Sequence, residues 1–479
     1  MSVLEQLRQQ GVAPARLTAD SRRVQPGDVF VAFPGVHADG RDFIAQAVAN
    51  GAAAVIAEAG RKVGAGEAPI VEVAGLAGLC GEIAHLVYGR PSEKLWLAGV
   101  TGTNGKTSVS QWIAQAMDAL GQRCAVVGTL GNGFVDALAE SPNTTPDAIT
   151  LHAALAGFLE RGARACAMEV SSIGLDQGRV NGAAFDVAVF TNLTRDHLEY
   201  HGSMEAYAAA KEKLFAMPGL GAAVINVDDA FGRELARRHR GRLPTLGYTL
   251  GASADATDEV LRAENLRMGP AGIQFELNGV TIAAPVVGRF NVSNLLAVAG
   301  AMLSRGESLD AIGAALRGIH PPPGRMQALG GHGQPLVIVD YAHTPDALEK
   351  ALGVLRETAT ARGGKLVCVF GCGGERDPGK RPQMGAVAEA LADDLLVTSD
   401  NPRGEDPQAI IAAIVDGMKS RPKVEPDRAR AVATVVTEAA AADVILLAGK
   451  GHEPYQELAG VRLPYSDLDA AKLALEARR

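Results

Sequence analysis

The chain has 479 residues, of which 46 are lysine or arginine and 54 are aspartate or glutamate, so its formal net charge is −8. Hydrophobic residues make up 47% of the chain, which is enough for several cores and excludes a disordered protein. The mild acidity argues against a protein held on nucleic acid by bulk charge, because phosphate neutralisation needs a basic surface. At roughly 150 residues per domain, the length predicts about three domains.

The sequence carries no pattern typical of targeting, membrane insertion or disulfide bonding. The opening segment, MSVLEQLRQQ, lacks the basic start and apolar core of a signal peptide. No window offers the roughly 18 uninterrupted apolar residues of a membrane span. The five cysteines are odd in number and widely spaced, which argues against a disulfide framework. We therefore expect a soluble, cytoplasmic, globular protein.

Short, Val-rich apolar runs alternate with helical periodicities along the chain. Such runs are typical of strands buried on both faces of a parallel sheet. They predict strands at residues 96–100, 125–130, 165–170, 186–190, 223–227, 336–339, 365–370, 395–398 and 444–447. Apolar residues repeat at intervals of three and four from Val109 to Leu120, and Gly121 ends that predicted helix. The alternation predicts α/β domains with mostly parallel sheets, whose ligands gather at the carboxyl ends of strands.

Two turn-rich segments divide the chain. Residues 89–92 (Gly-Arg-Pro-Ser) separate a helical stretch from the first Val-rich strand, and residues 320–324 (His-Pro-Pro-Pro-Gly) precede a fresh series of strands. We therefore expect three domains, at residues 1–92, 93–324 and 325–479.

A glycine-rich loop joins the strand at residues 96–100 to the helix that follows. The usual phosphate-loop spacing, G-x-x-x-x-G-K-[ST], would place its first glycine at Val100, so this loop is a variant. Such a loop turns backbone N–H groups toward phosphate oxygens, and adds a helix N-terminus, a lysine charge and a hydroxyl for magnesium. A glycine-rich turn that binds nothing is the alternative, which the order of strand, Gly-Lys-Thr and helix disfavours. We expect a nucleoside triphosphate to contact Gly102, Thr103, Asn104, Gly105, Lys106, Thr107 and Ser108.

Polar side chains follow two further predicted strands. Glu169 stands at the carboxyl end of one strand, where magnesium beside a nucleotide needs oxygen ligands, although a solvated or salt-bridged glutamate fits as well. The dense polar run at residues 191–201 contains the pair Asp196 and His197 and is typical of an active-site loop, with a structural histidine as the open alternative. Lys211 lies in a helical stretch and, from the pattern alone, resembles a surface lysine.

Seven segments together carry a resemblance to a known family. They are, in chain order, residues 102–108, 169–172, 192–197, 210–211, 290–294, 324–326 and 339–346. These segments resemble the Mur ligases of cytoplasmic peptidoglycan synthesis, which use ATP to join an amino acid to a UDP-linked muramoyl peptide. The resemblance covers essentially the whole chain. It implies an N-terminal UDP-muramoyl-binding domain of smaller α/β type, a central P-loop ATPase with a mostly parallel sheet, and a Rossmann-like C-terminal domain that binds the amino acid.

The resemblance also implies Mg²⁺ as cofactor and ATP as co-substrate. In the family, the lysine at the position of Lys211 is carbamylated, which replaces a cation that would repel magnesium by an anion that can ligate it. The implied catalytic residues are Lys106, Glu169, His197 and Lys211. The implied magnesium ligands are Thr107, Glu169, His197 and carbamylated Lys211. The residues implied to contact adenine and ribose are Asn291, Arg325 and Asp340.

The N-terminal segments at residues 18–22 and 27–32 resemble the family member that adds the third amino acid. Without the family, they indicate only a turn and a strand. The resemblance implies that the UDP-muramoyl dipeptide contacts Ala19, Ser21, Asn143, Thr144, Thr145, Ser171, Gln177 and Arg179. The hydroxyl, amide and guanidinium groups among these residues suit the carbonyls and carboxylates of that substrate.

The segment Asp400-Asn401-Pro402-Arg403 follows the predicted strand at residues 395–398. Its carboxylate can hold an ammonium and its arginine can bind a carboxylate bidentately, although a D-N-P turn is common by itself. Within the family the segment resembles the recognition motif for meso-diaminopimelate, and lysine-adding relatives usually lack that arginine. The residues implied to complete this pocket are Arg376, Gly449 and Glu453.

The resemblance implies a ligase that adds meso-diaminopimelate to the D-glutamate of UDP-N-acetylmuramoyl-L-alanyl-D-glutamate through an acyl phosphate. We expect a monomer whose partners are these small molecules and ATP, with no nucleic acid. The nearest alternative is the same reaction with L-lysine, which Arg403 disfavours. A folylpolyglutamate synthase generally lacks the domain seen before residue 92. A P-loop switch or motor would leave the C-terminal domain unexplained, and a non-catalytic nucleotide-binding scaffold would leave the polar cluster unexplained.

Overall fold

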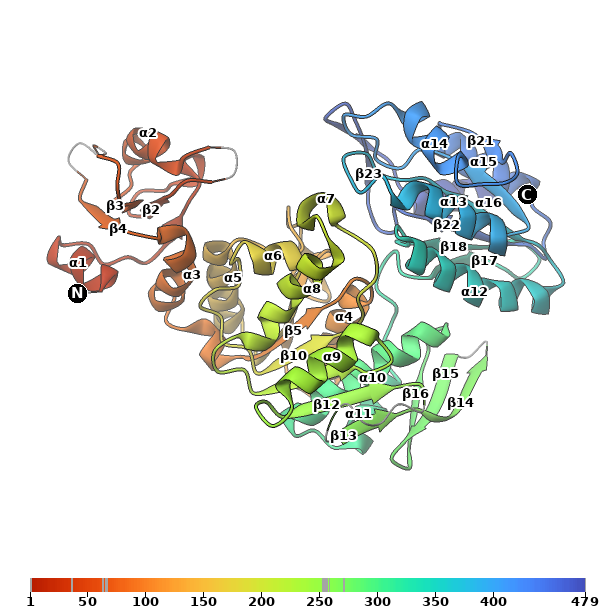
Figure 1. Ribbon diagram of the computed structural model, residues 1–479, viewed down its shortest axis with the longest axis horizontal. Coiled ribbons are helices and arrows are strands. Elements are labelled where there is room, and N and C mark those ends of the chain that lie inside the picture. The colour runs from red at the N-terminus through yellow and green to blue at the C-terminus, as the bar shows by residue number, and fades with distance from the viewer. Residues whose placement is uncertain are drawn as a thin grey trace.

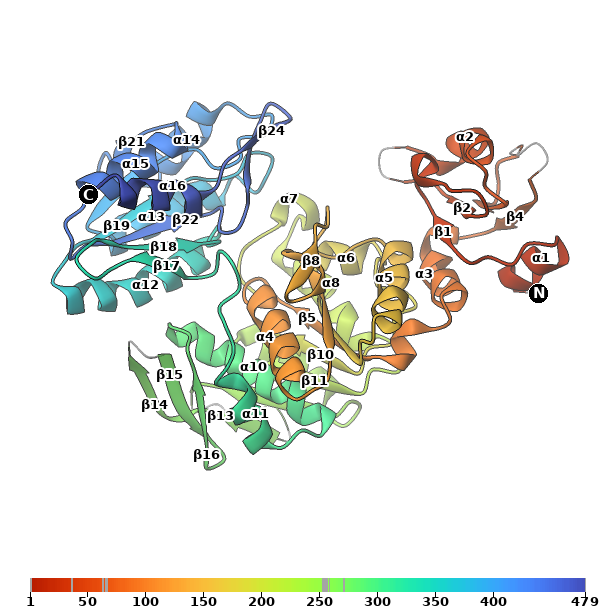
Figure 2. The same cartoon turned by 180° about the vertical axis from the view of Figure 1, so that it is seen from behind.

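The computed structural model describes residues 2–35, 38–62, 64, 68–251, 257, 259–269 and 272–478. These residues form three successive α/β units, each with its own sheet of parallel or mostly parallel strands. Figure 1 places the N-terminal and C-terminal units on opposite sides of the central unit, and Figure 2 agrees from behind. No helix in the described ranges is long and apolar enough to cross a membrane. All five cysteines are free and buried.

The N-terminal unit is a four-stranded parallel sheet with helices on both faces. Its elements are α1 (Val3–Gln9), β1 (Leu17–Thr18), η1 (Ser21–Arg23), β2 (Val29–Ala32), η2 (Gly40–Phe43), α2 (Ile44–Ala49), β3 (Ala54–Glu58), β4 (Ile70–Val73), α3 (Leu76–Val87) and η3 (Pro91–Lys94). Leu7 of α1 and Leu76 of α3 pack on one face, and Ile44 of α2 packs on the other. The strands are buried because both faces are covered.

The central unit carries a nine-stranded sheet and a small antiparallel sheet. Its strands are β5 (Trp96–Thr101), β6 (Cys124–Gly128), β7 (Gly131–Phe134), β8 (Ala137–Ala139), β9 (Ala165–Glu169), β10 (Val187–Phe190), β11 (Ala222–Asn226), β12 (Thr245–Thr249), β13 (Glu259–Arg262), β14 (Glu264–Gly269), β15 (Gly272–Leu277) and β16 (Val280–Ala284). The large sheet has the order β13-β12-β11-β10-β5-β9-β6-β7-β8 and is parallel except for β7 and β8. Strands β14 to β16 form the separate antiparallel sheet.

Helices cover both faces of the large sheet and bury its strands. They are α4 (Lys106–Ala119), α5 (Ala148–Glu160), α6 (Ser172–Asp176), α7 (Leu198–His201), α8 (Met204–Glu212), η4 (Lys213–Ala216), α9 (Ala230–His239), α10 (Arg289–Arg305) and α11 (Leu309–Leu316). Trp112 of α4 and Met302 of α10 join the core on one face, and Leu155 of α5 and Leu235 of α9 join the core on the other. Because β5 lies between β9 and β10, the loops that follow these three strands begin side by side.

The C-terminal unit is a six-stranded sheet in the order β17-β18-β22-β19-β20-β21, in which only β17 is antiparallel. Its elements are β17 (Gln327–Gly330), β18 (Leu336–Asp340), α12 (Pro345–Arg362), β19 (Leu366–Phe370), α13 (Lys380–Leu391), β20 (Asp394–Val397), α14 (Pro407–Val415), β21 (Lys423–Val424), α15 (Arg428–Glu438), β22 (Val444–Ala448), β23 (Tyr455–Leu458), β24 (Val461–Pro464) and α16 (Asp467–Glu476). Leu352, Met384 and Ile414 pack from α12, α13 and α14 on one face, and Val432 and Leu475 pack from α15 and α16 on the other.

Each strand predicted from a Val-rich run is present within two residues of its expected bounds, and the predicted helix is α4. The three-unit α/β architecture with mostly parallel sheets is confirmed. The sequence patterns missed β7, β8, the sheet of β14 to β16 and most of the N-terminal sheet. Strands β8, β15 and β16 are short or exposed on one face, so they lack the continuous apolar run that marks a doubly covered strand, whereas β3 of the N-terminal sheet is buried and was missed although it carries such a run.

A fully buried ion pair holds the C-terminal unit together at the edge where its loops begin. Arg428 at the start of α15 and Asp467 at the start of α16 are both 0% exposed and share hydrogen bonds of 2.8 and 2.7 Å. The same guanidinium donates to the carbonyl oxygens of Ser399 (3.2 Å) and Ala448 (2.8 Å), just after β20 and at the end of β22. Arg428 therefore fixes the starting points of two loops.

We expect the substitution Arg428→Met to lower the free energy of unfolding by about 3–5 kcal/mol, because it leaves the buried Asp467 carboxylate without its partner. Urea denaturation followed by circular dichroism measures the change. Arg430→Met on the same helix is the matched control, since the exposed Arg430 pairs with Glu425 and such a surface pair contributes about 0–1 kcal/mol. Equal losses in the two variants would contradict this account of the buried pair.

Candidate active site

The loop after β5 has the geometry of a phosphate loop. Gly102 and Gly105 have φ angles of +146° and +90°, a conformation that favours glycine. A Cβ on Gly102 would lie 1.9 Å from the Thr191 hydroxyl oxygen, so the position has no room for a side chain. The Lys106 ammonium folds back and donates to the carbonyl oxygens of Gly102 and Thr103, both at 2.8 Å. The loop therefore brings a fixed cation to the N-terminus of α4, as the sequence predicts.

Lys211 is a buried lysine, so the surface position suggested by its sequence pattern is wrong. Its side chain is 1% exposed, and its ammonium donates to the Gly102 carbonyl oxygen at 2.9 Å. The helix α8 buries Lys211 because this face packs against the loop, with the Tyr207 ring 4.3 Å from the ammonium nitrogen. Burial lowers the pKa of Lys211 well below its usual value, and the nearby charge of Lys106 lowers the pKa further. Two ammonium groups thus converge on a single carbonyl oxygen.

Glu169, at the end of β9, faces the first turn of α4. Its Oε2 accepts hydrogen bonds from the Thr107 hydroxyl (3.0 Å) and the Thr129 hydroxyl (3.2 Å), and its Oε1 accepts from the Thr129 backbone N–H (2.8 Å). A Cβ on Gly128 would lie 2.4 Å from Oε1, so only glycine leaves room for the carboxylate. The structure therefore brings together two of the predicted magnesium ligands, Thr107 and Glu169.

The residues predicted at adenine and ribose approach the phosphate loop from the C-terminal side. Arg325 donates to the Thr107 hydroxyl oxygen at 2.9 Å, and its guanidinium lies 4.6 Å from the centre of the Tyr341 ring. Asp340 accepts from the Met326 backbone N–H at 2.7 Å, and burial raises the pKa of its carboxyl. Asn291 on α10 accepts a hydrogen bond from Asn294 at 2.9 Å. Asn294 in turn lies against Gly105 of the phosphate loop.

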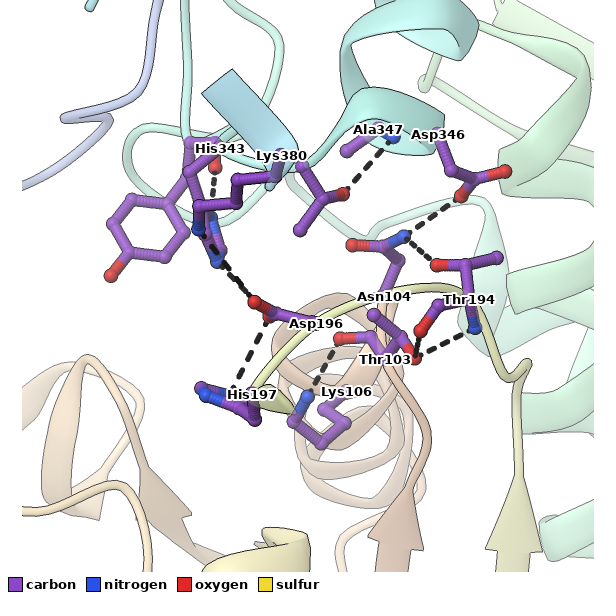
Figure 3. Close-up of polar contacts among 12 residues, drawn as sticks. Thr103, Asn104, Lys106, Thr194, Asp196, His197, His343, Asp346, Ala347 and Lys380 are labelled. Atoms are coloured by element: carbon purple, nitrogen blue, oxygen red, sulfur yellow. Dashed lines mark hydrogen bonds and ion pairs between the residues drawn. The ribbon is translucent and has the colours of Figure 1, made fainter. Parts of the chain in front are cut away.

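A buried carboxylate, Asp196, joins the central and C-terminal units beside the phosphate loop (Figure 3). Its oxygens lie 3.5 Å from the ring of His197, 3.7 Å from that of His343 and 3.6 Å from the Lys380 ammonium. Burial by itself would raise the pKa of Asp196, but the nearby His343, His197 and Lys380 lower this pKa well below its usual value. The carboxylate is therefore ionised at neutral pH.

Two further polar contacts dock the C-terminal unit on the same loops. The Asn104 side chain in the phosphate loop donates to Asp346 at 2.8 Å (Figure 3). Arg195 makes two parallel hydrogen bonds to Asp377, at 2.9 and 3.1 Å. Such paired charge-assisted bonds fix direction as well as distance. The loop at residues 192–197 thus contacts both the phosphate loop and the C-terminal unit.

The predicted muramoyl-dipeptide residues fall into two groups. The Thr145 hydroxyl donates to the Glu169 carbonyl oxygen (2.9 Å) and lies 3.1 Å from the Ser171 hydroxyl, and Arg179 donates to the Thr145 carbonyl oxygen (2.9 Å). Close to this group, Gln177 accepts from Arg179 and Thr144 contacts the Thr129 hydroxyl. The structure places Ala19 and Ser21 apart from this group, in an open pocket of the N-terminal unit, and Asn143, next to Thr144, is exposed.

The residues predicted to bind the amino acid lie on the loops after β20 and β22, except Arg376, which lies on the loop after β19. Asn401 donates to Glu453 at 2.8 Å, and a Cβ on Gly449 would lie 2.4 Å from an Asp400 oxygen. Arg403 has a φ of +53° and donates to the Gly374 carbonyl oxygen at 2.7 Å. Pro402 lies between these groups in the same loop. Arg376 is exposed and donates to the carbonyl oxygen of the residue before it, so it stands at the rim.

Sequence reasoning missed several residues that the structure brings to this site. Thr129, Asp346, Asp377 and Lys380 all contact predicted site residues. The position of Thr129 at the carboxyl end of a predicted strand was a usable signal. The other three act across the contact between two units, and no local pattern reports such a contact.

The fold and the site define a three-domain, P-loop nucleotide-binding protein whose C-terminal unit carries side chains of both charges on neighbouring loops. Family models match in the same order along the chain. The Mur ligase family catalytic domain matches residues 15–88, the Mur ligase middle domain matches residues 100–302, and the Mur ligase glutamate ligase domain matches residues 324–451.

Similar proteins give the same result over nearly the whole chain. A curated relative from Pseudomonas aeruginosa, a UDP-N-acetylmuramoyl-L-alanyl-D-glutamate--2,6-diaminopimelate ligase, is 55% identical over 96% of this chain and 95% of its own length. A relative of the same name from Chromobacterium violaceum is 52% identical over 98% and 96%. A solved structure of a ligase of that name is 38% identical, with a TM-score of 0.68, and covers 97% of this chain and 95% of that chain. The MurF ligase from Thermotoga maritima in complex with ADP shares the fold, with a TM-score of 0.68 at 20% identity. The match covers 100% of this chain and 99% of that chain.

The chain belongs to the Mur ligase family of ATP-dependent, amide-bond-forming ligases.

We expect Gly128→Ala to lower the ligase rate by about tenfold to a hundredfold while leaving the fold intact, because the added Cβ displaces the Glu169 carboxylate from its hydrogen bonds. Steady-state kinetics measure the rate and thermal melting checks the fold. Gly157→Ala in α5 is the control, since a Cβ there meets nothing within 4 Å. An unchanged rate in the Gly128 variant would rule out a strict position for the Glu169 carboxylate.

Proposed function

We propose that this protein is the ligase that adds meso-diaminopimelate to the D-glutamate of UDP-N-acetylmuramoyl-L-alanyl-D-glutamate, in the cytoplasm, during synthesis of peptidoglycan precursors. The relatives named above, more than half identical to this chain, support the reaction. The observation that carries the choice of amino acid is that Asp400, Arg403 and Glu453 bring both signs of charge to neighbouring loops. We propose that a monomer acts on these small molecules and ATP, without nucleic acid.

We propose the domain limits 1–92, 93–324 and 325–479, with roles in order of UDP-muramoyl binding, ATP binding and amino-acid binding. The separate sheets of the three units support this division. The phosphates of ATP would contact residues 102–108, and the adenine and ribose would lie toward Asn291, Arg325 and Asp340. Muramoyl-dipeptide binding would involve the group around Thr145 together with Ala19, Ser21 and Asn143.

The donor atoms beside the phosphate loop suit Mg²⁺. Among the described residues, no three His, Cys, Asp or Glu side chains cluster as a metal site. The protein therefore offers the Thr107 hydroxyl and the Glu169 carboxylate, which are hard oxygen donors of the kind that Mg²⁺ prefers beside phosphates. Magnesium held there would neutralise negative charge on the phosphates. His197 lies beside Asp196 and Glu199, and its role as a ligand remains a prediction.

Carbamylation of Lys211 would supply a further oxygen donor. Its amine is buried next to the Lys106 ammonium, and its lowered pKa increases the neutral fraction that can react with CO₂. The product is an anion, so it converts repulsion between two cations into attraction. The contact of both amines with one carbonyl oxygen supports this modification.

The proposed reaction has two steps. The γ-carboxylate of D-glutamate attacks the γ-phosphorus of ATP, forming an acyl phosphate and releasing ADP. The amine of meso-diaminopimelate then attacks the acyl carbon, giving up a proton as phosphate leaves. The residues of this chain contribute by position and charge: Lys106 and the loop N–H groups bind phosphate oxygens, and the docked C-terminal unit brings the amine to the carboxylate.

Phosphate release from ATP in the presence of Mg²⁺ and the UDP-muramoyl dipeptide tests the proposed function. Parallel reactions contain meso-diaminopimelate, L-lysine or no amino acid. We expect rapid release only with meso-diaminopimelate. A preference for L-lysine would keep the ligase and overturn the choice of amino acid. Equal release in all three arms would indicate a switch or motor.

We expect Arg403→Met to lower kcat/KM for meso-diaminopimelate by about a hundredfold or more, because the variant leaves the distal carboxylate of the amino acid unpaired. The value for L-lysine, which has no such carboxylate, should change little. Kinetics with both amino acids measure the two ratios, and Arg421→Met at an exposed position of the same domain is the control. Equal losses for both amino acids would contradict a specific role for Arg403.

A further inference from the structure

Lys450 is a buried cation beneath the amino-acid pocket. It follows β22 directly, and its side chain is 0% exposed. Its ammonium donates to the Glu453 carboxylate (Oε2, 2.9 Å) and to the Asn401 side-chain oxygen (2.9 Å). A buried ammonium needs such partners, because no water can solvate it. Lys450 therefore ties together the two loops that carry the pocket.

The Asn401 side chain is held on both sides. Its oxygen accepts from Lys450 and from the Glu457 backbone N–H (3.0 Å), and its nitrogen donates to Glu453 Oε2 (2.8 Å). Asn401 is buried, at 2% exposed, so little of it is open to a ligand. In the described structure, it connects the loops rather than projecting into the pocket.

Both bonds to Glu453 use the same oxygen. Oε2 accepts from Lys450 and from Asn401, whereas within the described residues Oε1 has no protein donor. The Glu453 side chain is 15% exposed, which gives a ligand access to it. One oxygen is therefore anchored to the protein and the other is available.

The side chains around Glu453 carry both signs of charge. The pocket presents two carboxylates, Asp400 and Glu453, and one arginine, Arg403, which donates to a backbone carbonyl rather than to either carboxylate. Lys450 supplies a second positive charge from below, where it offsets a carboxylate without occupying the space of the ligand. Arg403 thus stays available to a ligand carboxylate.

We infer that Lys450 is a positioning residue for amino-acid recognition. It holds Glu453 by Oε2 so that Oε1 accepts the ammonium at the distal end of the amino acid, and it fixes the loop of Asn401 at the same time. Lys450 does not touch the amino acid itself. The inference rests on the proposed function, and it adds a residue that acts on the KM for the amino acid through Glu453.

The first test is Lys450→Met in the full-length enzyme. We expect the KM for meso-diaminopimelate to rise by about tenfold to a hundredfold, because the Glu453 carboxylate loses its charged donor. The kcat and the KM values for ATP and for the UDP-muramoyl dipeptide should stay near those of the wild type. A parallel rise in all three KM values, or a fall in kcat alone, would overturn the inference, since a merely structural lysine would act on the whole site.

A double-mutant cycle separates action through Glu453 from an independent effect. If Lys450 acts mainly through Glu453, then Lys450→Met combined with Glu453→Gln should raise the KM for meso-diaminopimelate by much less than the product of the two single effects. Multiplication of the two single effects would overturn the inference.

Controls keep the result interpretable. Lys423→Met removes an exposed lysine of the same domain and should leave all three KM values unchanged. If thermal melting shows that the methionine variant does not fold, Lys450→Gln retains a hydrogen-bond donor without the charge, and the same selective rise is expected. A wild-type enzyme that uses another amino acid would overturn the proposed function. The role of Lys450 would then be decided by whether Lys450→Met raises the KM for that amino acid and leaves the KM values for ATP and the UDP-muramoyl dipeptide unchanged.

Discussion

Two ammonium groups share one carbonyl oxygen at the centre of this molecule. Lys106 from α4 and Lys211 from α8 both donate to Gly102, and burial lowers the pKa of each. Like charges in a buried site are unfavourable unless anions lie close by. The rest of the site can supply those anions. Negative charge near the two amines would come from phosphate oxygens bound on the loop, from the Glu169 carboxylate and from a carbamate on Lys211 itself.

The second constraint is that this centre is completed across two domains. Asp196 lies among His197, His343 and Lys380, so it links the loop after β10 to the C-terminal unit. In that unit, Arg428 holds the two loops of the amino-acid pocket from inside and Lys450 ties them together at their ends. The pocket and the phosphate loop are thus parts of one framework, which suits a reaction that must bring an amine to an activated carboxylate.

The sequence predicted those parts of the fold and site that depend on local pattern. Val-rich runs marked the doubly covered strands, and Gly-Lys-Thr after β5 marked the phosphate loop, because strand burial and phosphate binding both require particular residues at fixed spacing. The sequence pattern did not predict the burial of Lys211, because a lysine in an Ala-rich helix is buried only by tertiary packing. The contacts of Asp346 and Asp377 were not predicted either, because they join segments far apart in the chain. The family resemblance, and not periodicity, supplied most of the ligand-binding residues.

The most direct measurement is ¹³C NMR of the enzyme in ¹³C-bicarbonate, which detects a carbamate carbon. We expect a carbamate signal that disappears in Lys211→Met and persists in Lys213→Met, which replaces the neighbouring exposed lysine. The signal should weaken as the pH falls, because protonation of the amine removes the form that reacts with CO₂, and the lowered pKa of Lys211 should preserve it to a lower pH than for a free lysine. A wild-type enzyme that is fully active without this signal would contradict the account.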